Sequence, residues 1–304
     1  MTFAERVAAI AGLGFGPTQA PFLTTVALHS GYCLRRQYAA FIGCTYRKKA
    51  SDFLDGLVVR NLARRITYGA NRGGIYHLFG ERLYAAIGQR GDRNRRHASP
   101  PVIARKLMLL DFVIAHGHFT WFATASDRID LFVNRFGVPA SVFSRRTGES
   151  KKTVRAGNQN APVFLHGASP TVHFVTVVTD AHASAIKTFV REHTPLLRHL
   201  LDWSLHVVVA RSVATDAACH VAYQRRLAAA SLTSISKADL EWFERTKPLV
   251  ERGDLRDLRV EDLRRYREVS ATVGQGLHGS AAGPLTVHHL PHAYEQFGSL
   301  AGIC

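Results

Sequence analysis

Apolar positions recur at helical spacing near the start of the chain. Between Leu34 and Ile42, apolar side chains fall at positions i, i+4, i+7 and i+8, which lie on one face of a helix. Gly43 ends this stretch. Thr45 can cap a second helix over 46–59, because its hydroxyl can accept a hydrogen bond from an otherwise unpaired amide. The pattern therefore predicts two consecutive helices joined by a short turn.

A hairpin is expected directly after this pair of helices. The segments 63–68 and 74–79 have the composition of strands, and the glycines that separate them supply the permissive backbone of a tight turn. Arg72 would lie at the tip of this hairpin. Phe53 and Tyr76 are expected in the core. Further helices are expected around these elements, over 1–16, 22–30 and 81–87.

Strands and helices alternate in the second half of the chain. The β-rich runs 161–165 and 172–178 precede an expected helix over 182–200 and a strand over 205–210. Strand, helix and strand in this order predict a parallel crossover in an α/β domain. The remaining expected elements are a helix over 102–115, a short strand over 121–123 and helices within 216–270. The tail, 271–304, has no pattern that assigns it.

The fold class that follows is an α+β N-terminal winged helix domain followed by an α/β domain with a helical C-terminal extension. The order of two helices and a Gly-rich hairpin is the one that a winged helix-turn-helix uses to place a helix against a DNA groove. The expected boundaries are 1–90 for the winged helix, 91–101 for a basic linker, 102–215 for the α/β domain and 216–304 for the helical extension and tail.

The charge of the chain indicates which kind of partner it binds. The chain has 304 residues, a formal net charge of +16 and a sequence pI near 10.2. Residues 31–96 contain fourteen Arg and Lys against four acidic residues. Duplex DNA carries about one negative charge per 1.7 Å, so clustered basic side chains gain free energy there by releasing counterions. Double-stranded DNA is therefore the expected partner, with solubility, RNA and acidic lipid as open alternatives.

The expected DNA contacts follow from where the charges lie on these elements. The first turn of the second helix carries Arg47, Lys48 and Lys49, which can bond guanine or phosphate oxygens in a major groove. A wing tip at Arg72 would reach the neighbouring minor groove. The alternative is that these side chains are a solvated helix end and a packing hairpin. The full set of expected DNA-binding residues is Arg35, Arg36, Thr45, Tyr46, Arg47, Lys48, Lys49 and Arg72.

Cysteine usage and apolar runs bear on the compartment. The four cysteines, Cys33, Cys44, Cys219 and Cys304, are widely spaced and fit neither a disulfide framework nor a CxxC metal site. The first residues, MTFAERVAAIAG, contain too short an apolar run for a signal peptide. No run approaches the roughly 20 apolar residues that cross a bilayer. A reduced, cytoplasmic protein associated with the nucleoid and not with a membrane is expected.

The N-terminal region resembles the winged-helix part of the plasmid replication-relaxation family. The resemblance rests on RRQYAAFIGCTYRKKASDFLDGLVVRNLARR, the Gly-rich hairpin, and then IYHLFGERLYAAIG, and it covers about sixty residues. In that family the C-terminal part looks like a restriction-endonuclease-type fold. The stretch that would match is APVFL, then VHFVTVVTDAHASAIKTFVREHTPLLRHLLDW, then LHVVVAR. The resemblance thus implies a degenerate nuclease-like second domain.

The residues that such a nuclease needs are missing from this stretch. A metal-dependent nuclease holds Mg²⁺ with acidic residues on two neighbouring strands and carries a Lys beside them. Here Val163 stands where an Asp is expected, and the body of VHFVTVV has no carboxylate. Asp180 and Lys187 follow later, while Asp127 and Asp130 are more typical of a solvated helix face. The sequence therefore predicts a nuclease-like scaffold with no catalytic residues, no metal and no cofactor.

Histidine clusters and known enzyme motifs do not change this interpretation. The densest clusters are His116 with His118 and the group from His288 to His292, and neither has the Glu or Cys spacing of a known metal site. No Walker loop, Rossmann fingerprint or Gly-x-Ser-x-Gly elbow is present. Tyr294 lacks the Arg-His-Arg context of a recombinase nucleophile.

The expected function is that of a non-enzymatic protein that binds duplex DNA. The resemblance implies a plasmid or mobile element as its setting, with a role as transcriptional regulator or as replication or transfer accessory factor. A homodimer is expected, because two half-sites increase affinity and specificity. Two alternatives stay open, a metal-dependent DNA nuclease and a protein-interaction module with an acidic partner.

Overall fold

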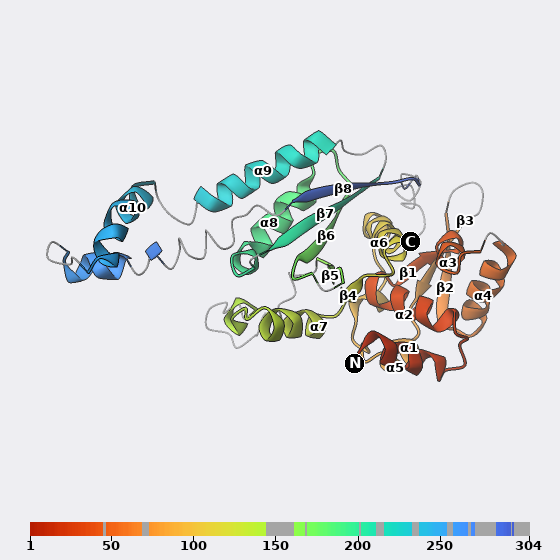
Figure 1. Ribbon diagram of the computed structural model, residues 1–304. Coiled ribbons are helices and arrows are strands. Elements are labelled where there is room, and N and C mark those ends of the chain that lie inside the picture. The colour runs from red at the N-terminus through yellow and green to blue at the C-terminus, as the bar shows by residue number, and fades with distance from the viewer. Residues whose placement is uncertain are drawn as a thin grey trace.

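The computed structural model describes most of the chain, and it shows a mixed α/β protein with two sheets (Figure 1). The described residues are 1–44, 47–68, 73–143, 161–167, 169–200, 202–210, 216–232, 237–253, 258–266, 269–270, 284–292 and 294.

The N-terminal part contains the pair of helices and the hairpin that the sequence predicts. Its elements are α1 (Phe3–Ala11), α2 (Gln19–His29), β1 (Tyr32–Leu34), α3 (Arg35–Phe41), α4 (Arg47–Val59), β2 (Ala63–Tyr68), β3 (Gly73–Leu78) and α5 (Glu81–Ala86). The first helix is shorter than expected and ends at Ala11. The strand β1 was not predicted, since three residues are too few to show an alternating pattern.

The three-stranded sheet is antiparallel and has the order β1-β3-β2. Its two faces pack against different helices. Cys33, Tyr76 and Leu78 belong to a core with α1, α2, α4 and α5, whereas Tyr32 and Ile75 face the helix α6 (Pro100–Ala115). The expectation that Tyr76 is a core residue is confirmed, because its exposed fraction is 0%.

The C-terminal part is built on a five-stranded mixed sheet of order β4-β5-β6-β7-β8. Its strands are β4 (Thr120–Phe122), β5 (Val163–Leu165), β6 (Val172–Val178), β7 (Trp203–Ala210) and β8 (Leu285–Leu290), and its helical elements are α7 (Ala125–Asp130), η2 (Leu131–Arg135), η3 (Ala140–Phe143), α8 (Ser184–Leu197), α9 (Asp216–Leu232) and α10 (Lys237–Glu251). β4, β5 and β6 form an antiparallel meander. β6 and β7 pair in parallel across α8, which confirms the predicted crossover.

The strand β8 changes the expected division of the chain. Residues 216–304 were expected to form a helical extension and tail, but Leu285–Leu290 pair in parallel with β7 and add a fifth strand to the sheet. In Figure 1, α10 lies apart from this sheet, and its Phe243 packs in a small separate cluster with Val269. The tail thus returns to the body of the protein after the helical segment.

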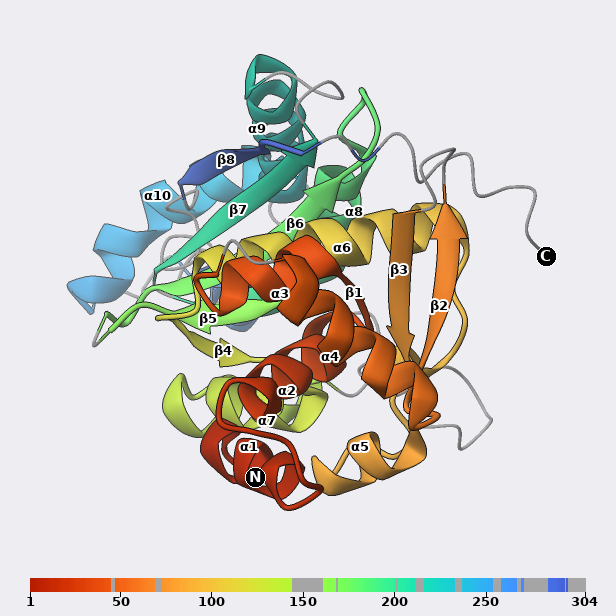
Figure 2. The same ribbon diagram turned by 90° about the vertical axis from the view of Figure 1, so that its right-hand side faces the viewer.

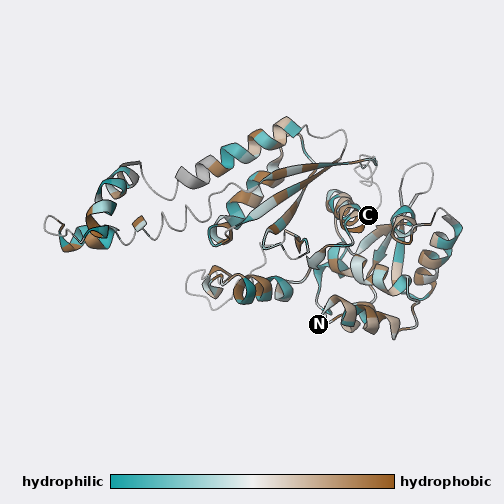
Figure 3. Ribbon diagram, viewed as in Figure 1, coloured by the Kyte–Doolittle hydropathy of each residue, from teal (hydrophilic) through white to brown (hydrophobic). Residues whose placement is uncertain are grey.

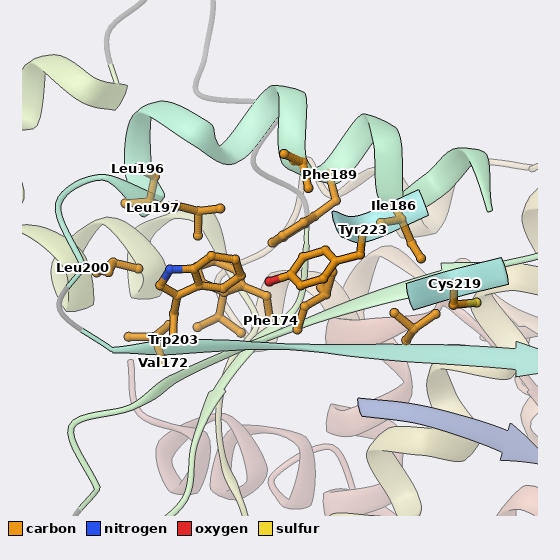
Figure 4. Packing of buried hydrophobic residues seen from close by; sticks show 14 of the residues in the cluster. Val172, Phe174, Ile186, Phe189, Leu196, Leu197, Leu200, Trp203, Cys219 and Tyr223 are labelled. Atoms are coloured by element: carbon orange, nitrogen blue, oxygen red, sulfur yellow. The ribbon is translucent and has the colours of Figure 1, made fainter. Parts of the chain in front are cut away.

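Large apolar side chains fill the space between the five-stranded sheet and α8. Trp203, Phe174 and Phe189 lie within this core, and Tyr223 of α9 closes it (Figure 4). Coloured by hydropathy, β6 and β7 are predominantly apolar along their length (Figure 3). This composition is typical of strands that are covered on both faces. The second face of the sheet is covered by α6.

The helix α6 is shared by both parts of the protein. Leu107 and Met108 lie in one core together with Ile75 of the small sheet and Val175 and Val208 of the large sheet. Figure 2 shows α6 running between α3 on one side and β6 and β7 on the other. The two parts therefore share buried apolar surface through one helix.

The segment 91–101, expected to be a linker, is packed against the N-terminal part. Asn94 is buried, and its amide nitrogen donates to the carbonyl oxygen of Ala27 at 3.0 Å. Gly31 has a φ of 75°, and a Cβ at this position would collide with the carbonyl oxygen of Asn94. Pro100 and Pro101, read as linker, form the first turn of α6, where Pro is well tolerated because the amide there has no helical partner.

Candidate nucleic-acid interface

The outward face of α4 carries the basic residues that the sequence singled out. Ala50, Leu54 and Leu57 are buried against the N-terminal core and fix the rotation of the helix. Lys48 and Lys49 are exposed in its first turn, as expected. No ion pair with either lysine is found among the described residues. The structure therefore presents two ammonium groups to solvent at the start of a well-anchored helix.

Four of the expected contacts cannot be placed. Thr45, Tyr46 and Arg72 lie outside the described residues, and so does the side chain of Arg47, although its backbone begins α4. Their roles in DNA binding stay predictions.

Arg35 joins three elements of the N-terminal part. Its Nε donates to the hydroxyl of Tyr76 at 2.9 Å, and its Nη2 lies 3.1 Å from a carboxylate oxygen of Asp55. The hydroxyl of Tyr76 donates to the same carboxylate at 2.5 Å. Burial, together with this bond to Asp55, raises the pKa of Tyr76 to about 12. Arg35 thus connects α3 to α4 and β3, and its side chain is about one-third exposed, at 35%.

Arg36 connects α3 to the second part of the protein. Its guanidinium makes two hydrogen bonds of 2.7 Å to the carboxylate of Asp111 on α6. The neighbouring Gln37 donates from Nε2 to the carbonyl oxygen of Leu107 at 2.8 Å. Arg35 and Arg36 therefore differ from Lys48 and Lys49. The two arginines make contacts within the protein, whereas the two lysines are exposed to solvent.

Arg65 on β2 is a candidate that the sequence analysis missed. It is exposed and pairs in register with Tyr76, so its side chain lies on the face of the small sheet that carries α4. A Cβ at Gly74 would lie 2.7 Å from Arg65 Nε, which shows that the side chain runs across this glycine. Side chains alternate between the two faces of a strand, and this alternation could have indicated that Arg65, and not the adjacent Arg64, faces α4.

The acidic residues considered for nuclease chemistry have structural partners. Asp180 accepts from the amides of His182 and Ser184 at 3.0 and 3.2 Å and so caps α8. Asp127 accepts two bonds of 2.9 Å from Arg6 of α1. Asp130 accepts from Asn134 at 2.5 Å. Each carboxylate thus has its own contacts: Asp180 at the start of α8, Asp127 between α7 and α1, and Asp130 between α7 and η2.

Histidines from three strands meet on the face of the large sheet that α6 covers. His173 Nδ1 lies 3.1 Å from His206 Nε2, and His206 Nδ1 lies 2.9 Å from His288 Nε2. The ring of His116 lies 5.7 Å from that of His288. Burial lowers the pKa of His206 to about 3. No group of three His, Cys, Asp or Glu side chains in the described ranges is placed to hold a metal ion.

Comparison with known proteins returns no relative. No protein family, curated protein or solved structure matches this chain. The resemblance to the plasmid replication-relaxation family therefore remains a prediction. None of the described helices is both long enough and apolar enough to cross a bilayer.

Proposed function

We propose that residues 1–90 form a winged helix-turn-helix unit that binds duplex DNA. The order α2, β1, α3, α4, β2, β3 and the sheet order β1-β3-β2 are those of a winged helix, with α4 as the recognition helix. The sequence resemblance supports the same fold. A plasmid or mobile element would be the setting, and the protein would act there as a transcriptional regulator or as a replication or transfer accessory factor.

The exposure of Lys48 and Lys49 at the start of α4 carries this proposal. The N-terminal turn of a recognition helix is the part that comes closest to the DNA in a major groove. Two lysines there can bond phosphate or base-edge oxygens, and their contacts release counterions from the duplex. Arg65 lies on the same side of the small sheet as α4, where it can reach the phosphate backbone of the DNA beside the groove that α4 enters.

The fold and the carboxylate contacts of the second part favour a scaffold role over an enzymatic one. Its order α6, β4, β5, β6, α8, β7 is that of the core of restriction-endonuclease-like folds. The acid closest to the position that such a fold uses, Asp180, is engaged in capping α8, and Lys187 is exposed on that helix. We infer that this part positions the winged helix and supports self-association as a homodimer.

The lysine contacts can be tested by binding of a labelled duplex across a salt series. Replacing Lys48 and Lys49 together by Ala should lower affinity roughly ten- to a hundredfold near 0.1 M salt, and it should reduce the salt slope by about 1.8. The matched control replaces Lys187 and Arg191, two exposed basic residues of α8, by Ala. Equal losses in both double variants would show that general charge, and not α4, drives binding.

The nuclease alternative needs a separate experiment. Supercoiled plasmid is incubated with the protein and Mg²⁺ or Mn²⁺, and nicking is followed on a gel. The scaffold interpretation expects the same background for the wild type and for Asp180→Ala. Metal-dependent nicking that Asp180→Ala abolishes, in a variant that keeps its circular dichroism spectrum, would replace our proposal with an enzyme.

A further inference from the structure

The strand β6 has an edge that its neighbour covers only in part. β5 pairs with β6 at His173 and Phe174, and the amide of Val175 donates to the carbonyl oxygen of Pro162 at 2.9 Å. Pro162 has no N–H and returns no hydrogen bond to Val175, so the described pairing of β5 with β6 ends at this point. β6 nevertheless continues to Val178, paired there with β7 alone among the described strands.

The uncovered edge displays both kinds of backbone hydrogen-bonding group. Alternate residues of a strand direct their N–H and C=O groups to the same side. Because the amide of Val175 points toward β5, the N–H and C=O of Val177 point the same way. Within the described ranges, no backbone group bonds to Val177 on this side. In the part of the chain that the structure describes, the edge thus has one donor and two acceptors without a backbone partner over three residues.

This edge forms the floor of a groove of about 720 Å³. One wall is α8, and the other is the N-terminal half of α6 with the segment that precedes it. The lining of the groove along β6 runs from Val175 to Thr179, which corresponds to about five residues of extended chain at about 3.3 Å per residue. A groove of this kind is the geometry in which a peptide adds to a sheet as an extra strand.

The wall formed by α6 and the preceding segment is basic. Arg93, Arg96 and Arg105 all line the groove and are exposed, and none makes an ion pair with a described residue. Lys106 is anchored on the carbonyl oxygen of Ser30 at 2.8 Å. Burial, with the nearby charge of Arg93, lowers the pKa of Lys106 to about 8. Of the three arginines, Arg93 lies close enough to the half-buried Lys106 to lower the pKa of its ammonium group.

Little negative charge balances this wall. Among the described residues that line the groove, Asp180 and Glu192 are the acidic ones. Asp180 accepts from the amide of Ser184, the first residue of α8, and Glu192 lies 3.4 Å from Arg191. The carboxylates of a bound molecule could therefore contact the arginines of this wall, which have no ion-pair partner among the described residues, while its backbone lies along the edge of β6.

We propose that this groove binds an extended acidic segment of a partner protein, which adds to β6 as a strand. A nucleic-acid backbone fits the arginines but not the edge, because phosphodiester oxygens accept hydrogen bonds and cannot satisfy the C=O groups of Val175 and Val177. A peptide backbone supplies both donors and acceptors. Its acidic side chains would face the arginine wall, and its alternate side chains would pack on the opposite side.

Peptide binding to the 304-residue chain can be tested with a fluorescein-labelled octapeptide of alternating Val and Glu. We expect saturable binding by fluorescence anisotropy. N-methylation of alternate peptide amides keeps the charge but removes the strand donors, and it should weaken binding roughly tenfold. Arg96→Glu with Arg105→Glu should weaken binding at least as much. The matched control, Arg225→Glu with Arg226→Glu, changes two exposed arginines of α9 that do not line the groove, and it should leave binding unchanged.

Hydrogen exchange gives a second measurement that does not depend on a variant. The bound peptide should slow exchange at the amide of Val177, because this amide gains a partner. Absence of saturable binding, or equal binding of the N-methylated peptide, would overturn the proposal. An oligo-dT strand that binds in place of the peptide and is lost in the Arg96/Arg105 variant would also overturn it and assign the groove to phosphate. Neither result bears on Lys48 and Lys49.

Discussion

The guanidinium of Arg36 and the carboxylate of Asp111 form two parallel hydrogen bonds, each 2.7 Å long, across the contact between α3 and α6. The hydroxyl of Tyr294 completes the group, since it accepts from Arg36 at 3.1 Å and donates to Asp111. The helix before the proposed recognition helix is therefore held by side chains from the middle and from the C-terminal end of the chain. This relationship ties the DNA-binding unit to the rest of the protein.

Replacing Arg36 by Ala should affect stability more than DNA binding. Asp111 is only 12% exposed, and without its partner the carboxylate would lose two charge-assisted hydrogen bonds. We expect a loss of roughly 1–3 kcal/mol in the free energy of unfolding. A double-mutant cycle of Arg36→Ala with Asp111→Ala, measured by urea unfolding, should show that the two changes are not additive. If Arg36→Ala instead weakens duplex binding as much as the double lysine variant does, at unchanged stability, then Arg36 contacts DNA.

The shared helix α6 should make the two parts of the protein unfold together. Leu107 is fully buried in the core that both sheets contribute to, and Leu107→Ala should cost about 2–5 kcal/mol. Amide exchange at Ile75 of the small sheet and at Val208 of the large sheet should speed up by similar factors. The control is Val59→Ala on α4, where the side chain is 86% exposed and no change is expected. Protection that falls at only one of the two sites would show independent units.

Acidic pH should destabilise the protein through its buried histidines. Burial lowers the pKa of His29 to about 3 and that of His77 to about 4. The unfolded chain binds protons near its ordinary pKa of about 6.5, while the folded chain stays neutral at these sites, so stability is retained above about pH 6.5 and is lost as pH falls below it. Each group can contribute up to about 1.4 kcal/mol per pH unit.

Urea unfolding midpoints at about pH 7, 6 and 5 measure this dependence. His77→Phe removes one titrating group and keeps a ring that can stack on Tyr32, from which the His77 ring is 4.2 Å away. The slope of stability against pH should decrease in this variant, whatever its absolute stability. A midpoint that does not change between about pH 7 and 5 would contradict the burial of neutral imidazoles in the folded state.

Long periodic segments were predicted well, and short or isolated ones were not. The strand Val172–Val178 was expected with these limits, because a run of seven β-rich residues is a strong local signal. The strand Leu285–Leu290 was missed. It is identified by its pairing with β7, about eighty residues earlier in the chain, and nothing in the neighbouring residues reports that pairing.

In the candidate site, too, the features that depend on neighbouring residues were predicted, and those that depend on distant segments were not. Exposure of Lys48 and Lys49 followed from the apolar spacing of α4, since residues three and four apart share a helix face. The partners of Arg35 and Arg36 did not follow, because Asp55 and Asp111 come from other elements. The open edge of β6 also depends on where β5 stops pairing, which is a property of two strands together.

The sequence by itself determined which segments become helices and strands and where basic charge accumulates, because both depend on residues close together along the chain. Only the tertiary structure decided which of those charges are paired within the protein, which helix contributes to both cores and where, among the described residues, the edge of β6 lacks a backbone partner. Those features depend on contacts between distant segments, and the distance between two side chains is settled when the elements that carry them pack.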